Sequence, residues 1–149
     1  MAEHATEHLN VAAGHDQCIA VALDFERYPS WAPDVKEATV LERDALGRGV
    51  KVAFRAAAMG RSASYVLAYN YGEDNRVISW SLLEGDIMRV LDGTYVFAPA
   101  GDGTTDITYH LTVELVVPIP GFVRRRAEGK IVGTALRELK HRVESLPAT

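Results

Sequence analysis

Alternating apolar and polar residues dominate the middle of the chain and predict a meander of short strands. Between residues 35 and 116, apolar side chains recur at every second position, which is the period of a strand with one buried face. The clearest runs are VKVAFRAAA, SASYVLAYNY and TDITYHLTVEL, which begin at residues 50, 62 and 105. Short turn segments such as GEDN and PAGDGT separate the runs, so about six successive strands are expected to pair antiparallel through hairpins.

The two ends of the chain carry the patterns of a further strand and of helices. Residues 4–11 alternate like a half-polar strand. Within residues 12–25, Cys18, Ile19, Ala22 and Phe25 form one stripe of an amphipathic helix. Residues 118–146 place apolar side chains at every third or fourth position, which predicts one long helix of about seven turns.

The order of these elements predicts the fold class. A single sheet with one apolar face needs a cover, and the C-terminal helix is the only predicted element large enough to provide it. We therefore expect an α+β fold in which a curved antiparallel sheet of about six or seven strands wraps around the long helix. Two short helices after the first strand would close one end. The length of 149 residues fits a single domain, 1–149.

The stretch FERYPSWAPDV, residues 25–35, concentrates aromatic residues between two prolines. Pro29 and Pro33 prevent a long regular helix here, so a short helix and a bent loop are expected. Phe25 continues the buried stripe of the preceding helix. The cluster is open to three interpretations: an active-site device, a lid over a pocket, or a plug in the core. Because no titratable residue nearby has clear inward parity, we favour a wall or closing plug formed by Trp31 with Tyr28 beside it.

The predicted inner face of the sheet combines large aromatic residues with very small ones. Its aromatic members are Phe54, Tyr65, Tyr69, Trp80, Tyr95, Phe97 and Tyr109, and its small members are Ala56, Ala58, Ala63 and Gly93. This mixture is typical of interdigitated packing. It is equally typical of an apolar pocket that has phenol hydroxyls as its few polar groups. The pattern alone leaves both alternatives open.

Glu84 is the carboxyl group that the alternation places on this inner face, in line with Ile78, Trp80 and Leu82. A buried carboxylate there would have a raised pKa, which suits a general acid or base. The alternative is a turn or a bulge at Gly85 that returns Glu84 to water.

Composition and charge exclude several classes of function. The net charge of −4 and the pI of about 5.7 argue against nucleic-acid binding. Cys18 is the only cysteine, so no internal disulfide forms. The N-terminal residues lack the pattern of a signal peptide, and no apolar run approaches the roughly 18 residues of a membrane span. A cytoplasmic protein is expected. The five histidines are scattered, and no metal or cofactor motif is present, so neither a metal nor a cofactor is predicted.

Two features of the long helix have both a functional and a structural interpretation. Arg124, Arg125 and Arg126 oppose the dipole at the helix N-terminus. They form either a patch for an anionic group or lipid surface, or an ordinary solvated helix start. Gly129 and Gly133 share one face, where close approach of a strand, a ligand or a second protomer, or local flexibility, would explain them.

Four stretches give the chain a resemblance to the polyketide cyclase/dehydrase-like proteins of the START and Bet v 1-like superfamily. They are FERYPSWAPDVKEATVLERD, ISWSLLEGDIMRVLDGTYVF, GDGTTDITYHLTVEL and VPIPGFVRRRAEGKIVGTALRELKHRVE. The resemblance implies a helix-grip fold with a deep hydrophobic cavity between the sheet and the long helix. One departure is AAGHD at residues 12–16, where the family commonly has an Asp-Ala-Pro-like cap, so the first helix is expected to begin later, with Asp16 near its start.

Three functions remain open at this point. The first is binding of a lipid, isoprenoid, quinone or polyketide by a monomer or homodimer that inserts in no membrane, although transient membrane contact is allowed. The second is a polyketide cyclase or dehydratase that uses Glu84, Tyr65, Tyr69 or Tyr109. The third is an interaction protein whose cavity is vestigial. The residues predicted to bind the ligand are Trp31, Phe54, Tyr65, Tyr69, Trp80, Leu82, Tyr95, Tyr109, Phe122, Ile131 and Ala135.

Overall fold

The structure, a computed structural model, describes residues 3–58, 61–115 and 121–146, and for residues 3, 58, 61, 74, 115 and 121–132 it describes the backbone only. The described strands are β1 (Glu3–Val11), β2 (Val35–Arg43), β3 (Gly49–Ala58), β4 (Arg61–Tyr71), β5 (Val77–Gly85), β6 (Met88–Pro99) and β7 (Thr105–Leu115). The helices are α1 (His15–Leu23), α2 (Tyr28–Trp31) and α3 (Gly121–Ser145), with single 3₁₀ turns η1 (Phe25–Arg27) and η2 (Glu73–Asn75). The predicted order of elements is confirmed.

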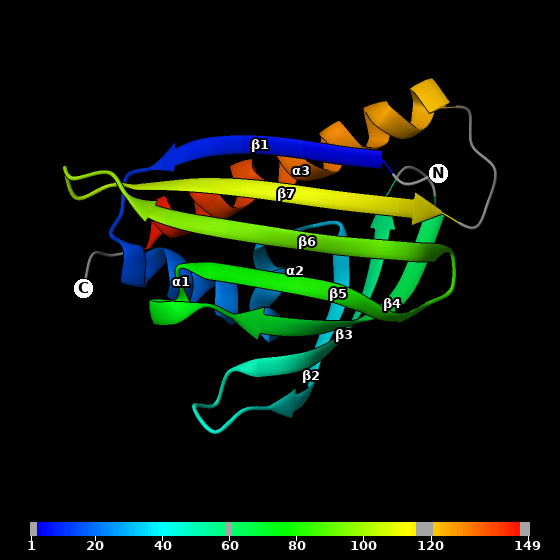
Figure 1. The fold of residues 1–149 in the computed structure, drawn as a ribbon, viewed down its shortest axis with the longest axis horizontal. Helices are drawn as coiled ribbons and strands as arrows, with labels where there is room; N and C mark the ends of the chain where they lie inside the picture. The colour runs from blue at the N-terminus through cyan, green and yellow to red at the C-terminus, as the bar shows by residue number, and fades with distance from the viewer. Residues whose placement is uncertain (1–2, 59–60, 116–120, 147–149) are drawn as a thin grey trace.

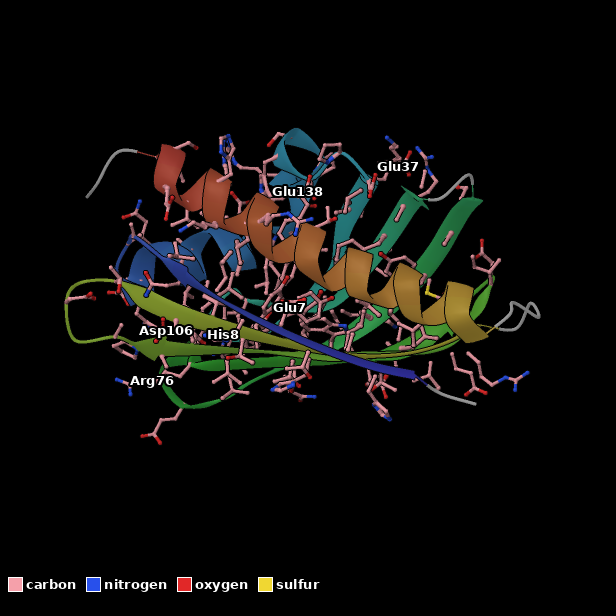
Figure 2. The ribbon with its side chains drawn as sticks, turned by 90° about the horizontal axis from the view of Figure 1, so that it is seen from above. Glu7, His8, Glu37, Arg76, Asp106 and Glu138 are labelled. Carbon is pink, nitrogen blue, oxygen red and sulfur yellow. The ribbon has the colours of Figure 1, made fainter. Side chains whose placement is uncertain are left out.

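All seven strands belong to one antiparallel sheet with the order β1-β7-β6-β5-β4-β3-β2. Successive strands from β2 to β7 are neighbours, because each turn between them is a hairpin. Figures 1 and 2 show α3 lying across one face of the sheet, with α1 and α2 beside the end where α3 finishes. The α+β helix-grip fold predicted from the pattern is therefore confirmed.

Helix α1 begins at the position that the departure at residues 12–16 predicted. Gly14 is its N-cap and makes no side-chain capping hydrogen bond, while Asp16 lies in the first turn. A negative charge there is favourable because the helix dipole is positive at its N-terminus. Cys18, Ile19 and Ala22 are buried, as the apolar stripe requires. The free thiol of Cys18 is buried too, and burial raises its pKa.

One buried hydroxyl group attaches the segment before α1 to the first residue of β7. Thr105 is fully buried and donates a hydrogen bond from its Oγ1 to the carbonyl oxygen of Ala13, at 2.8 Å. This bond holds the segment that precedes α1 against β7.

Substituting Thr105→Val is expected to lower the free energy of unfolding by about 1–3 kcal/mol. Valine keeps the shape of threonine but leaves the Ala13 carbonyl without this donor. The matched control is Thr108→Val on the outer face of the same strand, for which we expect a change within about 0.5 kcal/mol. Urea unfolding of both variants measures the difference, and equal midpoints would contradict the assignment.

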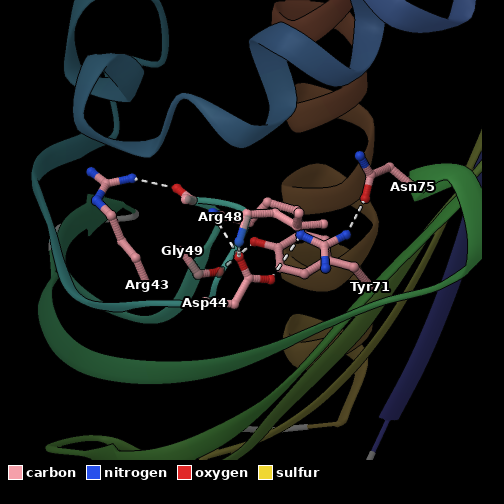
Figure 3. A network of polar contacts seen from close by, with 8 residues as sticks. Arg43, Asp44, Arg48, Gly49, Tyr71 and Asn75 are labelled. Atoms are coloured by element: carbon pink, nitrogen blue, oxygen red, sulfur yellow. Dashed lines mark hydrogen bonds and ion pairs between the residues drawn. The ribbon is translucent and has the colours of Figure 1, made fainter.

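A polar network fixes the turn between β2 and β3 against η2 (Figure 3). The guanidinium of Arg48 donates to Asp44 Oδ2 at 2.8 Å and to Asn75 Oδ1 at 2.6 Å. It also lies 4.5 Å from the ring centroid of Tyr71, whose hydroxyl donates to the Gly49 carbonyl. Burial opposes ionisation of Asp44, but hydrogen bonds from Arg48 hold the pKa of this carboxyl below its ordinary value.

Candidate functional site

The inner face of the sheet, which is the face that α3 crosses, carries a continuous set of aromatic rings. Strand pairing aligns Phe54 with Tyr65, and Tyr69 with Trp80. The rings of Phe54 and Tyr65 stack with centroids 5.5 Å apart, and those of Tyr69 and Trp80 lie 5.6 Å apart. Tyr95 continues the set with a ring centroid 5.4 Å from that of Trp80. The structure thus brings together six of the residues predicted to bind the ligand: Phe54, Tyr65, Tyr69, Trp80, Tyr95 and Tyr109.

Four phenol hydroxyls on this face have no protein partner within the described residues. Tyr65, Tyr69, Tyr95 and Tyr109 make ring contacts, but no hydrogen bond joins their hydroxyls to a described group. The only described side-chain polar atom that is both fully buried and unpaired is His15 Nε2. It follows that each of these hydroxyls keeps some accessible surface. A buried tyrosine usually finds a partner for its hydroxyl, so four open hydroxyls are typical of a face that receives a ligand or water.

The electrostatics of the inner face keep these phenols neutral. Burial raises the pKa of Tyr65 to about 12. Burial also raises the pKa of Tyr69, Tyr95 and Tyr109 well above the ordinary value, and neighbouring phenols add to the effect. A phenol with a raised pKa donates a hydrogen bond to a ligand oxygen but is a poor base. The described inner face therefore offers hydrogen-bond donors within an apolar surface, the arrangement of a small-molecule site.

Trp31 is the last residue of α2 and lies at the end of the sheet that α1 and α2 cover. Its ring contacts that of Tyr28 at 5.0 Å between centroids, and Tyr28 in turn lies 6.2 Å from Phe54 on the inner face. Trp31 also lines a pocket of about 150 Å³, whose other lining residues are Ala20, Val21, Asp24, Arg27, Arg142 and Leu146. Tyr28, which is absent from the predicted ligand-binding residues, separates Trp31 from the inner aromatic rings.

Glu84 lies on the outer face, as the alternative of a bulge near Gly85 predicted, and not on the inner face where regular alternation would place it. The register between β4 and β5 shifts between Val66 and Leu67, so Val66 pairs with Glu84 whereas Leu67 pairs with Leu82. Leu83 is the extra residue of this bulge, and Glu84 is exposed. The alternative interpretation placed a bulge at Gly85, and the observed bulge lies two residues earlier. Leu82 keeps its inward place and packs against the core.

Several predicted features belong to the part of α3 whose side chains are outside the described residues. These are Phe122, Ile131, Gly129 and the arginines at 124–126. Ala135 is described, and it packs against the core. Gly133 is described as well: the described atoms nearest to a Cβ atom there would belong to the side chain of Arg137, the first at 3.1 Å. Because that side chain is flexible, this contact does not explain the glycine, and no described strand comes closer.

Glu138 is a half-buried carboxyl group that the sequence pattern did not single out. It lies on the side of α3 that faces α2 and β2 (Figure 2). Burial raises its pKa, and the carboxylate of Asp34 adds to the effect. Its position in the helix repeat resembles that of the solvated residues around it. Only the residues near it in space show that Glu138 is half-buried and has a raised pKa.

A larger pocket, of about 530 Å³, lies over β2 to β5 on the face of the sheet opposite α3. Its charged residues are Glu37, Arg55, Glu84 and Asp86. Arg55 Nη2 pairs with Glu37 Oε1 at 3.1 Å, and Asp86 accepts hydrogen bonds from the backbone of Ser64. Apolar residues line this pocket as well, among them Phe54 and Tyr65, but its exposed charged groups make its lining more polar than the aromatic inner face.

Neither a metal centre nor a membrane span occurs in the part of the chain that the structure describes. No three histidine, cysteine or acidic side chains of that part lie together in a way that could hold a metal ion. None of its helices has both the length and the apolarity needed to cross a bilayer.

Comparison with known families identifies the class of this fold and site. The family model described as polyketide cyclase / dehydrase and lipid transport matches residues 2–144. The chain therefore belongs to this family, as its resemblance predicted. A comparison with curated proteins found no match.

Solved structures agree with this assignment. A START superfamily protein from Mycobacterium smegmatis is 27% identical, with a TM-score of 0.90 over 97% of this chain and 99% of that one. A protein from Thermus thermophilus is 24% identical, with a TM-score of 0.81 over 96% and 98% of the two chains. The Zhui aromatase/cyclase of a Streptomyces species is 16% identical, with a TM-score of 0.79 over 97% and 94%. The last two likenesses show the fold alone.

Proposed function

We propose that this protein binds a neutral hydrophobic small molecule between the inner face of the sheet and α3. The candidates are a lipid, an isoprenoid, a quinone or a polyketide, each of which combines an apolar body with few oxygen atoms. The observation that carries the proposal is the set of four unpaired hydroxyls, Tyr65, Tyr69, Tyr95 and Tyr109, within an aromatic surface. A ligand oxygen that accepts from one of them would satisfy a donor that the described protein leaves unpaired.

Binding without catalysis is favoured by the chemistry of the described inner face. Its phenols stay protonated because burial raises their pKa. Glu7 has inward parity opposite Tyr109, but it is exposed at the edge strand β1. A cyclase or dehydratase needs a group that takes up a proton, and neither the phenols nor Glu84 is suited to that role here. The proposal treats residues 1–149 as one domain that acts in the cytoplasm as a monomer or homodimer.

The ligand-binding residues proposed are those predicted from the sequence. They comprise Trp31 at the closed end, the inner-face residues Phe54, Tyr65, Tyr69, Trp80, Leu82, Tyr95 and Tyr109, and Phe122, Ile131 and Ala135 from α3.

Menadione, a neutral quinone that quenches tryptophan fluorescence, provides a direct test. We expect saturable quenching by the intact protein, because Trp80 lies among the inner rings. Tyr95→Phe should weaken menadione binding by about fivefold, the equivalent of one hydrogen bond of ~1 kcal/mol. Tyr71→Phe is the matched control, since its hydroxyl already bonds to Gly49, and it should leave binding unchanged.

Native mass spectrometry of the protein purified from its own host gives an independent reading. A co-purifying hydrophobic molecule would support the proposal. A ligand-free mass together with no saturable quenching would overturn it.

A further inference from the structure

The six-membered ring of Trp80 occupies the place where a side chain at position 93 would begin. Trp80 on β5 pairs directly with Gly93 on β6. A Cβ atom built on Gly93 would lie 2.2 Å from Cζ2, 2.5 Å from Cε2 and 2.9 Å from Cη2 of the indole. Non-bonded carbon atoms are most stable about 3.5–4.0 Å apart. Any other residue at position 93 would therefore have to move the indole.

This contact keeps the indole low against the sheet. Gly93 is buried and shares the inward parity of Leu91 and Tyr95, so a Cβ there would point toward α3. With alanine at position 93, the ring would rise by roughly 1–2 Å to reach an ordinary contact distance.

The low indole also lies at the centre of the aromatic surface. Its centroid is 5.6 Å from that of Tyr69, 5.4 Å from that of Tyr95 and 5.6 Å from that of Tyr109. These three neighbours carry open hydroxyls, so the indole forms the floor between the donors. The distance of the indole from the sheet therefore sets how thick a ring system can be and still reach the three hydroxyls.

We propose that the pair Trp80 and Gly93 determines the depth of the ligand space and selects flat ring systems over thick ones. The inference rests on the proposed function, because it assigns a specificity to the same site. A purely structural role is the competing explanation, since aromatic residues often cover a glycine on a neighbouring strand and stabilise the sheet. The two explanations differ in whether a change at this pair alters the preference between ligands.

The test compares two neutral probes, flat menadione and the thicker steroid progesterone, across a double-mutant cycle. Gly93→Ala should raise the Kd for menadione at least tenfold. Trp80→Phe, whose smaller ring covers less of Gly93, should shift the ratio of the two Kd values at least fivefold in favour of progesterone. The double variant W80F/G93A should return the Kd for menadione to within threefold of the wild-type value, because the methyl group fills the space that the indole leaves.

The matched control is Gly14→Ala, since a Cβ atom on Gly14 meets no atom within 4 Å. It should change neither Kd. If Gly93→Ala does not fold, the probe ratio of Trp80→Phe decides the matter.

The outcomes separate the two proposals. If the wild type binds menadione but the probe ratio is unchanged in Trp80→Phe, the depth assignment is wrong and the binding function stands. If the wild type binds neither probe, the binding function fails and the depth assignment falls with it.

Discussion

Replacing Phe25 with alanine is expected to lower the free energy of unfolding by about 3–5 kcal/mol, the range measured for large buried aromatic residues. Phe25 is 2% exposed and connects the first helical segment to the sheet. Its ring lies 4.7 Å from that of Tyr69, 5.5 Å from that of Tyr28 and 6.4 Å from that of Phe54. Removing it would leave a cavity where three elements meet.

The backbone around Phe25 cannot close such a cavity easily. The ring edge fits against Gly49, where a Cβ atom would lie 3.0 Å from Phe25 Cε2. The network of Arg48, Asp44 and Tyr71 holds the turn beside Gly49 in place. A rigid surrounding increases the loss, because the cost of a core truncation grows with the volume that stays empty.

Thermal unfolding measures this effect. For a chain of this length, a loss of 3–5 kcal/mol corresponds to a fall in Tm of roughly 6–20 °C. The matched control is Leu46→Ala, since Leu46 is 76% exposed at the β2–β3 turn, and its Tm should change by no more than about 2 °C. A Phe25→Ala variant as stable as this control would show that the helical end is not part of the core.

The fold could be predicted from the sequence because its signals are local. The alternation in residues 62–71 and the helical repeat in residues 133–143 need no knowledge of partners, and the structure places both as expected. The cover of the sheet by the long helix followed from the need to bury one apolar face. The late start of α1 was expected from the resemblance, because residues 12–16 depart from the cap that is common in the family.

The alternation within β5 could not decide between the inward and the outward position considered for Glu84, because the orientation of this residue depends on a pairing partner. A strand alternates between faces only while its register is regular, and one extra residue turns every later side chain over. The bulge at Leu83 is fixed by how β5 pairs with β4, which no periodicity within β5 records. The raised pKa of Glu138 could not be predicted for the same kind of reason, since its neighbour Asp34 comes from a segment that is distant in the sequence.

The inner face left two interpretations open, and the structure indicates that both describe part of it. At Gly93 a small residue lies opposite a large one in close packing, because the indole fills the space above it. At Tyr65 and Tyr95 the side chains are only half-buried although they lie among other rings. Composition cannot separate these cases, because each depends on where one rotamer directs one ring.

The six tyrosines are expected to resist ionisation at the pH where free tyrosine titrates. The chain contains six tyrosines, and burial raises the pKa of every one above the ordinary value of 10.0. For Tyr65 the pKa is about 12. In a spectrophotometric titration, the phenolate absorbance of the native protein should therefore stay low at pH 10, where about half of a set of ordinary tyrosines would be ionised.

The same shifts fix how stability depends on alkaline pH. A raised native pKa means that the native state holds its phenol protons more tightly than the unfolded state does. Stability is therefore unaffected below about pH 10, the unfolded pKa, and falls as the pH rises from there through the native pKa values. Unfolding should accordingly be abrupt above pH 10, with all the phenols ionising together.

The titration also distinguishes a dry inner face from one filled with water. Tyr71→Phe removes the tyrosine whose ring lies against Arg48. In this variant the total rise in phenolate absorbance should be smaller, and the midpoint of that rise should stay above about pH 10. Tyrosines that ionise reversibly near pH 10 while the circular dichroism stays native would mean that water reaches the rings freely. Such a face would lack the apolar character on which the proposed binding of a neutral ligand depends.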